Sequence, residues 1–218
     1  MKSSLAGAVA LGLLASAASA QISNGASGSS TMSYLSNEEG LQEVVGFGDC
    51  YAKQSPEKAL KLIATRPASR EEAQTYKSLF SKHYQSCLGD VTRLSADLAL
   101  IRGAIAQGLY KRKVPVPAAL MQPAPSVAQV RNVSDAARCY VASHADEARR
   151  VVTETKVGGR KEHDEVVKLM PDFFKCVPDG AKVQLTATLV RLRLAEALLR
   201  TLPSVAARAG TPLATAAE

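Results

Sequence analysis

The regular placement of four cysteines constrains this fold more than any other feature of the sequence. Cys50 and Cys87 are 37 positions apart, and so are Cys139 and Cys176, which lie 89 positions further along the chain. The first cysteine of each pair is followed by a tyrosine. A spacing that recurs in this way predicts an internal repeat, and a repeat has to be recognised before any fold is assigned.

Other residues follow the same shift. In the last third of each repeat, a shift of 89 aligns four residues with four others: Leu100, Arg102, Ala106 and Leu109 with Leu189, Arg191, Ala195 and Leu198. Between the cysteines the shift becomes 90, because Thr65 and Arg70 match Thr155 and Arg160 after the insertion of one residue. We therefore predict two divergent units, residues 41–113 and 132–202.

Four cysteines allow three pairings. If each unit is an independent copy, the bonds are Cys50–Cys87 and Cys139–Cys176. Redox or metal chemistry is the alternative role, but the sequence has no C-x-x-C motif and no histidine at ligand spacing from these cysteines. We predict structural disulfides, which would stabilise units of about 70 residues whose cores are small.

The residue composition and periodicity indicate helices. Hydrophobic residues make up 46% of the chain but aromatic residues only 5%, so the core consists mainly of Ala, Leu and Val. Ser55-Pro56-Glu57 is typical of a helix start, Ser69 with Glu72 forms a capping-box pattern, and Pro171 is expected to end or kink its helix. The fold class that we predict is all-α, with about eight helices in two four-helix units.

We expect the units to pack through their fourth helices. The fourth helix of the first unit is predicted over residues 94–112 and contains three small residues that permit close approach: Gly103, Ala104 and Gly108.

The segments outside the units have compositions of their own. Residues 1–20 resemble a signal peptide, with Lys2, an apolar stretch and Ala18-Ser19-Ala20 before the expected cut, although a retained anchor is the alternative. Residues 21–40 form a Ser/Gly-rich arm, 114–131 a Pro-rich linker, and 203–218 an Ala-rich tail that we expect to be disordered. A cleaved signal predicts a periplasmic or secreted protein with no stable membrane span.

The net charge is +7, and it falls to +6 without residues 1–20, which contain one lysine and no acid. A basic surface attracts acidic polymers, anionic lipids or nucleic acids, although it also serves solubility. The cations are spread along the chain and lie near helix ends, for example Lys111-Arg112-Lys113 and Arg149-Arg150. We therefore expect no nucleic-acid partner.

Arg102 and Arg191 are the candidate functional residues, because both units place an arginine at the edge of the fourth-helix stripe. One interpretation is a pair of anion-binding sites. The other is that each arginine covers the rim of the core with its stem while its head reaches water or a carboxylate.

No catalytic constellation is recognisable. The sequence has no G-x-S-x-G, P-loop, G-x-G-x-x-G or H-E-x-x-H motif, and His163-Asp164-Glu165 are neighbours that cannot face one site on a helix. We predict no catalytic residue, no metal and no cofactor.

Three stretches carry a resemblance to other proteins: FGDCYAK at 47–53, TRPASREE at 65–72 and LIRGAIAQGLY at 100–110. In these the chain resembles a group of uncharacterised exported proteins of alphaproteobacteria, of the sphingomonad type. The second unit matches more loosely, since Val157 replaces Pro67 and Leu192 replaces Gly103. The resemblance implies a bacterial envelope setting and no particular chemistry.

These observations favour a non-enzymatic module that binds another protein or an envelope component such as the cell wall. An enzyme or small-ligand carrier with a site between the units is the first alternative. An electrostatic binder of acidic polymers is the second.

Overall fold

The computed structural model describes residues 38–80, 85–88, 96–181 and 183–201, and within these ranges it is helical without strands. There are seven α-helices: α1 Glu38–Gln54, α2 Pro56–Ala64, α3 Arg70–Phe80, α4 Leu98–Lys111, α5 Val133–Glu154, α6 Arg160–Phe174 and α7 Ala187–Thr201. Three 3₁₀ turns join them: η1 Gln85–Cys87, η2 Ala118–Leu120 and η3 Val127–Gln129. The predicted all-helical class is confirmed. The predicted signal peptide and tail, and nearly all of the arm, lie outside the described residues.

The number of helices differs from the eight predicted because α5 covers two of them. Its backbone leaves the helical region at one residue, His144, which lies 89 positions after Ser55 between α1 and α2. After Ser55, Pro56 begins a new helix, since proline lacks an amide hydrogen. Ala145 stands at the corresponding later position and keeps its amide, so the helix can resume without a complete break.

The predicted helix starts are largely confirmed. Pro56 is the first residue of α2, and the Glu72 amide donates to Ser69 Oγ at 3.0 Å before α3. The Glu72 carboxylate accepts from the amide of Ala68 at 2.7 Å, one residue earlier than a capping box requires. Pro171 does not end its helix, because α6 continues through it to Phe174.

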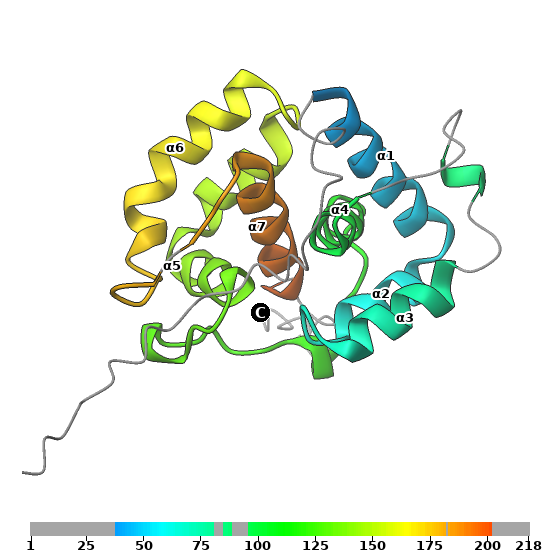
Figure 1. Cartoon of the computed structure of the whole chain (residues 1–218), viewed down its shortest axis with the longest axis horizontal. Helices are drawn as coiled ribbons and strands as arrows, with labels where there is room; N and C mark the ends of the chain where they lie inside the picture. Colours follow the sequence, from blue (N-terminus) through cyan, green and yellow to red (C-terminus); the bar gives the residue numbers. More distant parts are fainter. Residues whose placement is uncertain (1–37, 81–84, 89–95, 182, 202–218) are drawn as a thin grey trace, which may run out of the picture.

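Helices α4 and α7 lie side by side in the middle of the molecule (Figure 1). Helices α1, α2 and α3 pack on the α4 side, whereas α5 and α6 pack on the α7 side. We call α1–α4 the N-terminal half and α5–α7 the C-terminal half. Leu199 of α7 belongs to the hydrophobic core of the N-terminal half, and Tyr110 of α4 touches both cores.

Glycines set how closely these helices approach. A Cβ atom added at Gly103 would lie 2.5 Å from Leu192 Cβ, so Gly103 is the point of contact between α4 and α7. The other two predicted residues do not lie there. A Cβ at Gly108 would lie 2.8 Å from the carbonyl oxygen of Gly48, and Ala104 also faces Gly48, so both pack against α1.

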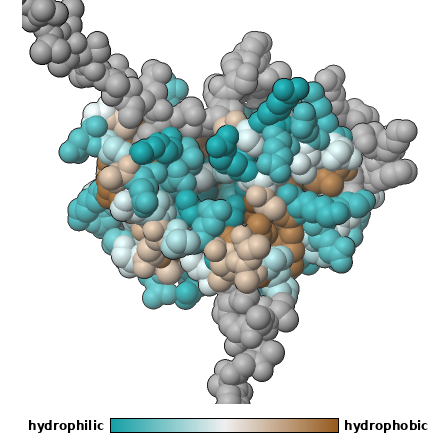
Figure 2. All heavy atoms as spheres, turned by 90° about the horizontal axis from the view of Figure 1, so that it is seen from below, coloured by the Kyte–Doolittle hydropathy of each residue, from teal (hydrophilic) through white to brown (hydrophobic). Residues whose placement is uncertain are grey.

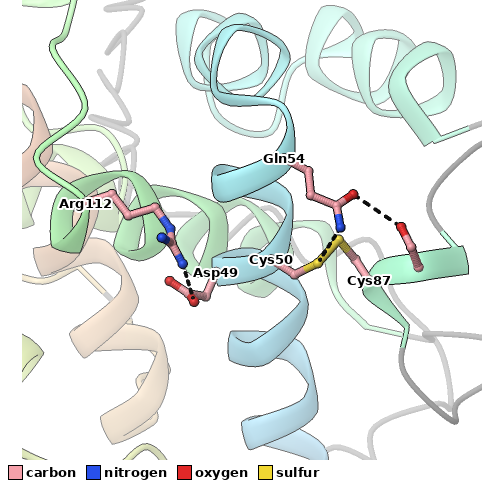
Figure 3. The surroundings of a disulfide bond; sticks show 6 residues. Asp49, Cys50, Gln54, Cys87 and Arg112 are labelled. Carbon is pink, nitrogen blue, oxygen red and sulfur yellow. Dashed lines mark hydrogen bonds and ion pairs between the residues drawn. A yellow bond between two sulfur atoms is a disulfide. The ribbon is translucent and has the colours of Figure 1, made fainter.

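The predicted disulfides are both present, Cys50–Cys87 and Cys139–Cys176, with Cα–Cα distances of 5.5 and 5.8 Å. The first joins α1 to η1, and the second joins α5 to the residues after α6. Figure 3 shows the first, where Gln54 donates to Cys50 Sγ and accepts from Ser86, while Asp49 pairs with Arg112 at 2.7 Å. Two disulfides and no free described cysteine suit an oxidising compartment.

The predicted Pro-rich linker is packed against the helices over part of its length. Val116 is completely buried in the core of the N-terminal half, and the Val114 amide donates to the Leu109 carbonyl at 3.0 Å. Its residues 117–119 remain exposed. The face of the molecule in Figure 2 is mainly hydrophilic, with hydrophobic residues gathered in a patch.

Candidate functional site

The most unusual feature of the structure is a group of charged residues buried between the two halves. It contains three arginines and two glutamates, none more than 8% exposed: Arg102, Arg193, Arg200, Glu72 and Glu196. Charged side chains are rarely buried to this degree unless they pair with one another. We call these five residues the buried charge cluster.

Arg102 of α4 caps the C-terminal end of α2, which belongs to the same half of the molecule. Its guanidinium donates to the carbonyl oxygens of Leu62 at 2.9 Å and Ile63 at 2.8 Å, at the C-terminal end of α2. The last carbonyls of a helix have no partner within the helix and carry partial negative charge, which a cation satisfies. Arg102 also donates to Thr65 Oγ1 at 3.1 Å and pairs with Glu72 of α3 at 2.9 Å.

Arg102 then reaches across to the other half. Its Nε donates to Glu196 Oε2 at 3.0 Å and its Nη2 donates to Glu196 Oε1 at 2.8 Å, so the pair is bidentate. Such paired hydrogen bonds between a planar guanidinium and a carboxylate fix orientation as well as adding attraction. All five N–H groups of Arg102 have an acceptor within the chain, and the residue is 0% exposed.

Glu196 is shared by three arginines. Besides Arg102, Arg193 lies 3.3 Å from its Oε2 and Arg200 lies 3.1 Å from its Oε1. Burial alone would raise the pKa of Glu196, but the nearby charges of Arg102, Arg200 and Arg193 together hold that pKa well below its usual range. Glu196 is therefore an ionised carboxylate on which the cluster is centred.

Arg200 extends the cluster to the Pro-rich segment. It donates to the carbonyl oxygens of Ile63 at 2.8 Å and Leu120 at 3.0 Å. One side chain of the last described helix thus contacts both the end of α2 and residues of the connection between the halves.

A second arginine, Arg191 of α7, makes a closely similar set of contacts. It donates to the carbonyl oxygens of Val151 at 3.0 Å and Val152 at 2.8 Å, and to Thr155 Oγ1. Its Nε donates across to Gln107 Oε1 of α4 at 2.8 Å. Each partner lies 89 or 90 positions from its counterpart around Arg102: Leu62 with Val151, Ile63 with Val152, Thr65 with Thr155, Glu72 with Glu162, and Glu196 with Gln107.

The two sets differ in charge. Where Arg102 meets Glu196, Arg191 meets the neutral amide of Gln107. Glu162 Oε1 lies 3.6 Å from Arg191 and has no hydrogen bond, whereas Glu72 is bonded to Arg102. Burial raises the pKa of Glu162, and the Gly158 amide and Arg191 lower it only in part. Burial also lowers the pKa of Arg191. The Arg191 set is electrostatically the weaker.

The predicted anion-binding residues Arg102 and Arg191 are thus buried, and each is bonded to groups of the chain itself. The anions that contact Arg102 are Glu72 and Glu196. An external anion at Arg102 would have to displace one of these carboxylates. Anion binding stays a prediction, and the contacts themselves assign both arginines to the junction of the halves.

The sequence analysis did not identify Glu72, Gln107, Glu196 or Arg200 as partners. One signal was available, because Glu72 and Glu162 follow the same shift of 90 as the matched threonines, and both are acidic. Gln107 and Glu196 are related by the shift of 89, but the repeat does not show that position 107 pairs with 191 and position 196 with 102. This pairing depends on how α4 crosses α7.

The two histidines in the described ranges, His144 and His163, form no comparable site. His83 lies outside the described residues. His144 accepts or donates a 2.9 Å hydrogen bond with Ser143 Oγ and stacks on Tyr140, and His163 is exposed beside Asp164. No group of three metal-ligating side chains occurs in the part of the chain that the structure describes.

Among the described helices, none is both long and apolar enough to cross a membrane. Comparison of the chain with protein-family models, with curated proteins and with solved structures found no match.

Proposed function

We propose that this chain is an exported, non-enzymatic binding protein built from two copies of one disulfide-stapled helical unit, with another protein or an envelope component as its partner. Support for the two copies comes from the matched contacts of Arg102 and Arg191 and from disulfides with the same separation of 37. A periplasmic or secreted location accords with those disulfides.

One observation carries the non-enzymatic part of the proposal. Most of the polar groups that converge where the halves meet are bonded to one another, with Glu162 Oε1 and Arg193 Nε as the exceptions, and Arg102 is 0% exposed. A catalytic or ligand site needs polar groups that a substrate can reach. The enzyme or carrier alternative would need Arg102 or Arg191 to exchange its internal partners for a ligand.

The outer surface offers a more accessible place for contact. Large hydrophobic side chains are exposed there at Val127, Val167 and Phe174, by 40%, 53% and 51%. Single exposed hydrophobic residues are ordinary, but Val167 and Phe174 lie on the same helix and two turns apart. A binding surface on α6 would leave the buried charge cluster to hold the halves together.

Photo-cross-linking in cells tests the proposal. A benzophenone amino acid would replace Phe174 or Val127, with the exposed polar residue Gln74 of α3 as the matched control. We expect a discrete adduct from Phe174 or Val127, with the partner identified by mass spectrometry, and none from Gln74. Absence of any adduct at both hydrophobic positions would contradict the proposal. An adduct that disappears above about 0.5 M salt would favour the electrostatic alternative instead.

A further inference from the structure

The outer side of α6 presents an apolar stripe. Val167 is 53% exposed and Phe174 is 51% exposed, Pro171 between them is also exposed, and Met170 is half-buried beside them. Residues three, four and seven positions apart lie on one side of a helix. The other side of α6 packs into the core through Val166, Leu169 and Phe173. We call Val167, Met170, Pro171 and Phe174 the α6 stripe.

At the position of Val167 the fold does not require a hydrophobic residue. Helix α3 stands in the N-terminal half where α6 stands in the C-terminal half, and the position 90 residues before Val167 is Lys77, which is exposed. Figure 1 places α6 at the outer edge of the molecule, away from α4. Val167, Pro171 and Phe174 therefore lie outside the core of the C-terminal half, whereas Met170 packs partly against it.

Two charged residues lie on one flank of the α6 stripe. Asp164 and Lys175 are eleven residues apart, and since eleven residues complete about three turns of 3.6 residues each, both project to nearly the same side of α6. Their side chains are 54% and 77% exposed. The midpoint between them falls next to Met170, within the α6 stripe.

This arrangement is self-complementary. Two copies of α6 can pack antiparallel about a two-fold axis near Met170. The axis then places the flank with Asp164 and Lys175 of one copy beside the same flank of the other copy, with the helix direction reversed. Asp164 of one copy then faces Lys175 of the other, twice, while the two apolar stripes cover each other. The present partners are exposed neighbours in the chain. Lys175 pairs with Asp172 at 2.6 Å, and Asp164 lies 3.6 Å from His163 and 3.9 Å from Arg160; such pairs are weak enough to exchange.

We infer that the α6 stripe is the interface of a symmetric homodimer, with antiparallel α6 helices and reciprocal Asp164–Lys175 ion pairs. An anionic lipid surface fits less well, because α6 carries four acids, of which Asp164, Glu165 and Asp172 lie outside the buried core and Glu162 is buried. A contact centred on two helices of 15 residues is small for a specific interface, so the dimer should be weak, with a Kd on the order of micromolar or above. This inference goes beyond the proposed function: it needs no envelope partner, and it assigns to a second copy of the chain the α6 surface that the proposed function offers to such a partner.

Sedimentation equilibrium of the oxidised full chain tests the dimer over a range of about 1 to 300 μM, which brackets such a Kd. The wild-type chain should shift from monomer to dimer across this range. Phe174→Ser and Val167→Ser should each weaken dimerisation by about tenfold or more, because each removes a central apolar contact. The matched control Lys77→Asp on α3 should leave the equilibrium unchanged.

Charge reversal gives a sharper result. Asp164→Lys and Lys175→Asp should each weaken the dimer, since each places like charges opposite one another. The double variant Asp164→Lys/Lys175→Asp should restore it to within about threefold of the wild type, because the pairing is then merely inverted. Circular dichroism of each variant would verify that these exposed substitutions leave the fold intact.

The inference is overturned if the wild type stays monomeric throughout, or if a dimer forms that the α6 variants do not weaken. It is also overturned if the double charge reversal is no better than either single one. A monomer that sediments with phosphatidylglycerol vesicles, and loses this with Phe174→Ser, would assign the α6 stripe to lipid. Each of these results would leave the cross-linking of an envelope partner unaffected. Failure of the dimer and failure of the proposed function can therefore be told apart.

Discussion

At the scale of single residues, Glu196 is the carboxylate on which the buried charge cluster is centred. It is 3% exposed, and it is bonded to Arg102, Arg193 and Arg200. A buried ion pair contributes little net stability relative to apolar residues, but removing one partner leaves the remaining charges unpaired. The stability lost on removing one partner is therefore larger than the net stability that the ion pair contributes.

Glu196→Gln should lower the free energy of unfolding by about 3–5 kcal/mol, since it leaves three buried arginines with Glu72 as the one carboxylate of the cluster. Urea denaturation monitored by circular dichroism measures this. The matched control is Glu165→Gln on the surface of α6, where the pair with Lys168 is solvated and little change is expected. Equal losses in the two variants would contradict a special role for the buried cluster.

The pH dependence of stability should also depend on Glu196. Its pKa in the folded state lies below the usual value of 4.5, so its contribution is present above about pH 4.5 and is lost as the pH falls towards the folded pKa. Glu162 acts in the opposite sense. Its raised pKa means that its ionisation costs stability as the pH rises from 4.5 through the folded pKa.

Acid titration of stability can separate these two residues. Relative to the wild type, Glu196→Gln should lose less stability between about pH 5 and pH 2, and Glu162→Gln should gain stability relative to the wild type as the pH rises above about 4.5. Parallel curves for the wild type and both variants would disprove the assigned pKa directions.

At the scale of elements, the turns that precede α3 and α6 form a matched pair. Ala68 has φ 59° and Gly158 has φ 73°, and each donates its amide to the glutamate four residues later. The left-handed region costs a residue with a Cβ about 1 kcal/mol or more, and glycine avoids that cost.

Ala68→Gly should therefore stabilise the protein by about 0.5–1 kcal/mol, because relief of strain exceeds the added entropy of the unfolded chain. Gly158→Ala should destabilise it by more than about 1 kcal/mol, since the new Cβ is strained and would lie 3.0 Å from Glu38 Cα. Thermal unfolding of the two variants would reveal the opposite signs. Shifts of the same sign would refute the comparison.

Helix α1 offers a second matched pair in two glycines that lie two residues apart. A Cβ at Gly48 would lie 2.3 Å from the carbonyl carbon of Ala104, whereas a Cβ at Gly46 would meet nothing within 4 Å. Of these two glycines, Gly48 is therefore the one on which the close approach of α1 to α4 depends.

Gly48→Ala should push α1 away from α4 and cost about 2 kcal/mol or more, as overpacking does. Gly46→Ala should instead add about 0.5–1 kcal/mol, since alanine is the better helix former at an exposed position. Chemical denaturation measures both changes. A tolerated Gly48→Ala would mean that α1 and α4 are not held at this distance.

At the scale of the whole molecule, the contacts between the halves should make unfolding a single event. Arg102 joins α4 to α2 and α7, Arg200 joins α7 to α2 and the Pro-rich segment, and Leu199 packs in the core of the N-terminal half. Neither half can unfold without leaving buried charges of the other unpaired.

We therefore expect one unfolding transition, with coincident far-ultraviolet and tyrosine signals. Replacing both Cys50 and Cys87 with Ser should lower stability by about 2–4 kcal/mol and still give one transition, because the junction couples the halves. Replacing Cys139 and Cys176 serves as the matched comparison. Two resolved transitions would show that the halves are independent domains.

Much of the fold follows from local patterns that the sequence contains by itself. The cysteine spacing was enough to choose one disulfide pairing out of three, and the Pro56 and Ser69 signals located two helix starts. Such features depend on a few neighbouring residues or on a repeated distance, so they are readable without coordinates. The two helices predicted between residues 132 and 155 are present as the two segments of α5, which are joined by a kink at His144.

The tertiary structure alone decided which groups Arg102 and Arg191 contact. From sequence, Arg102 and Arg191 are cations beside an apolar stripe, compatible with a ligand site or a core rim. Their partners across the junction, Glu196 and Gln107, are 94 and 84 residues away and depend on how α4 crosses α7 at Gly103. A long-range pairing of this kind follows from helix packing geometry, which local propensity and periodicity do not encode.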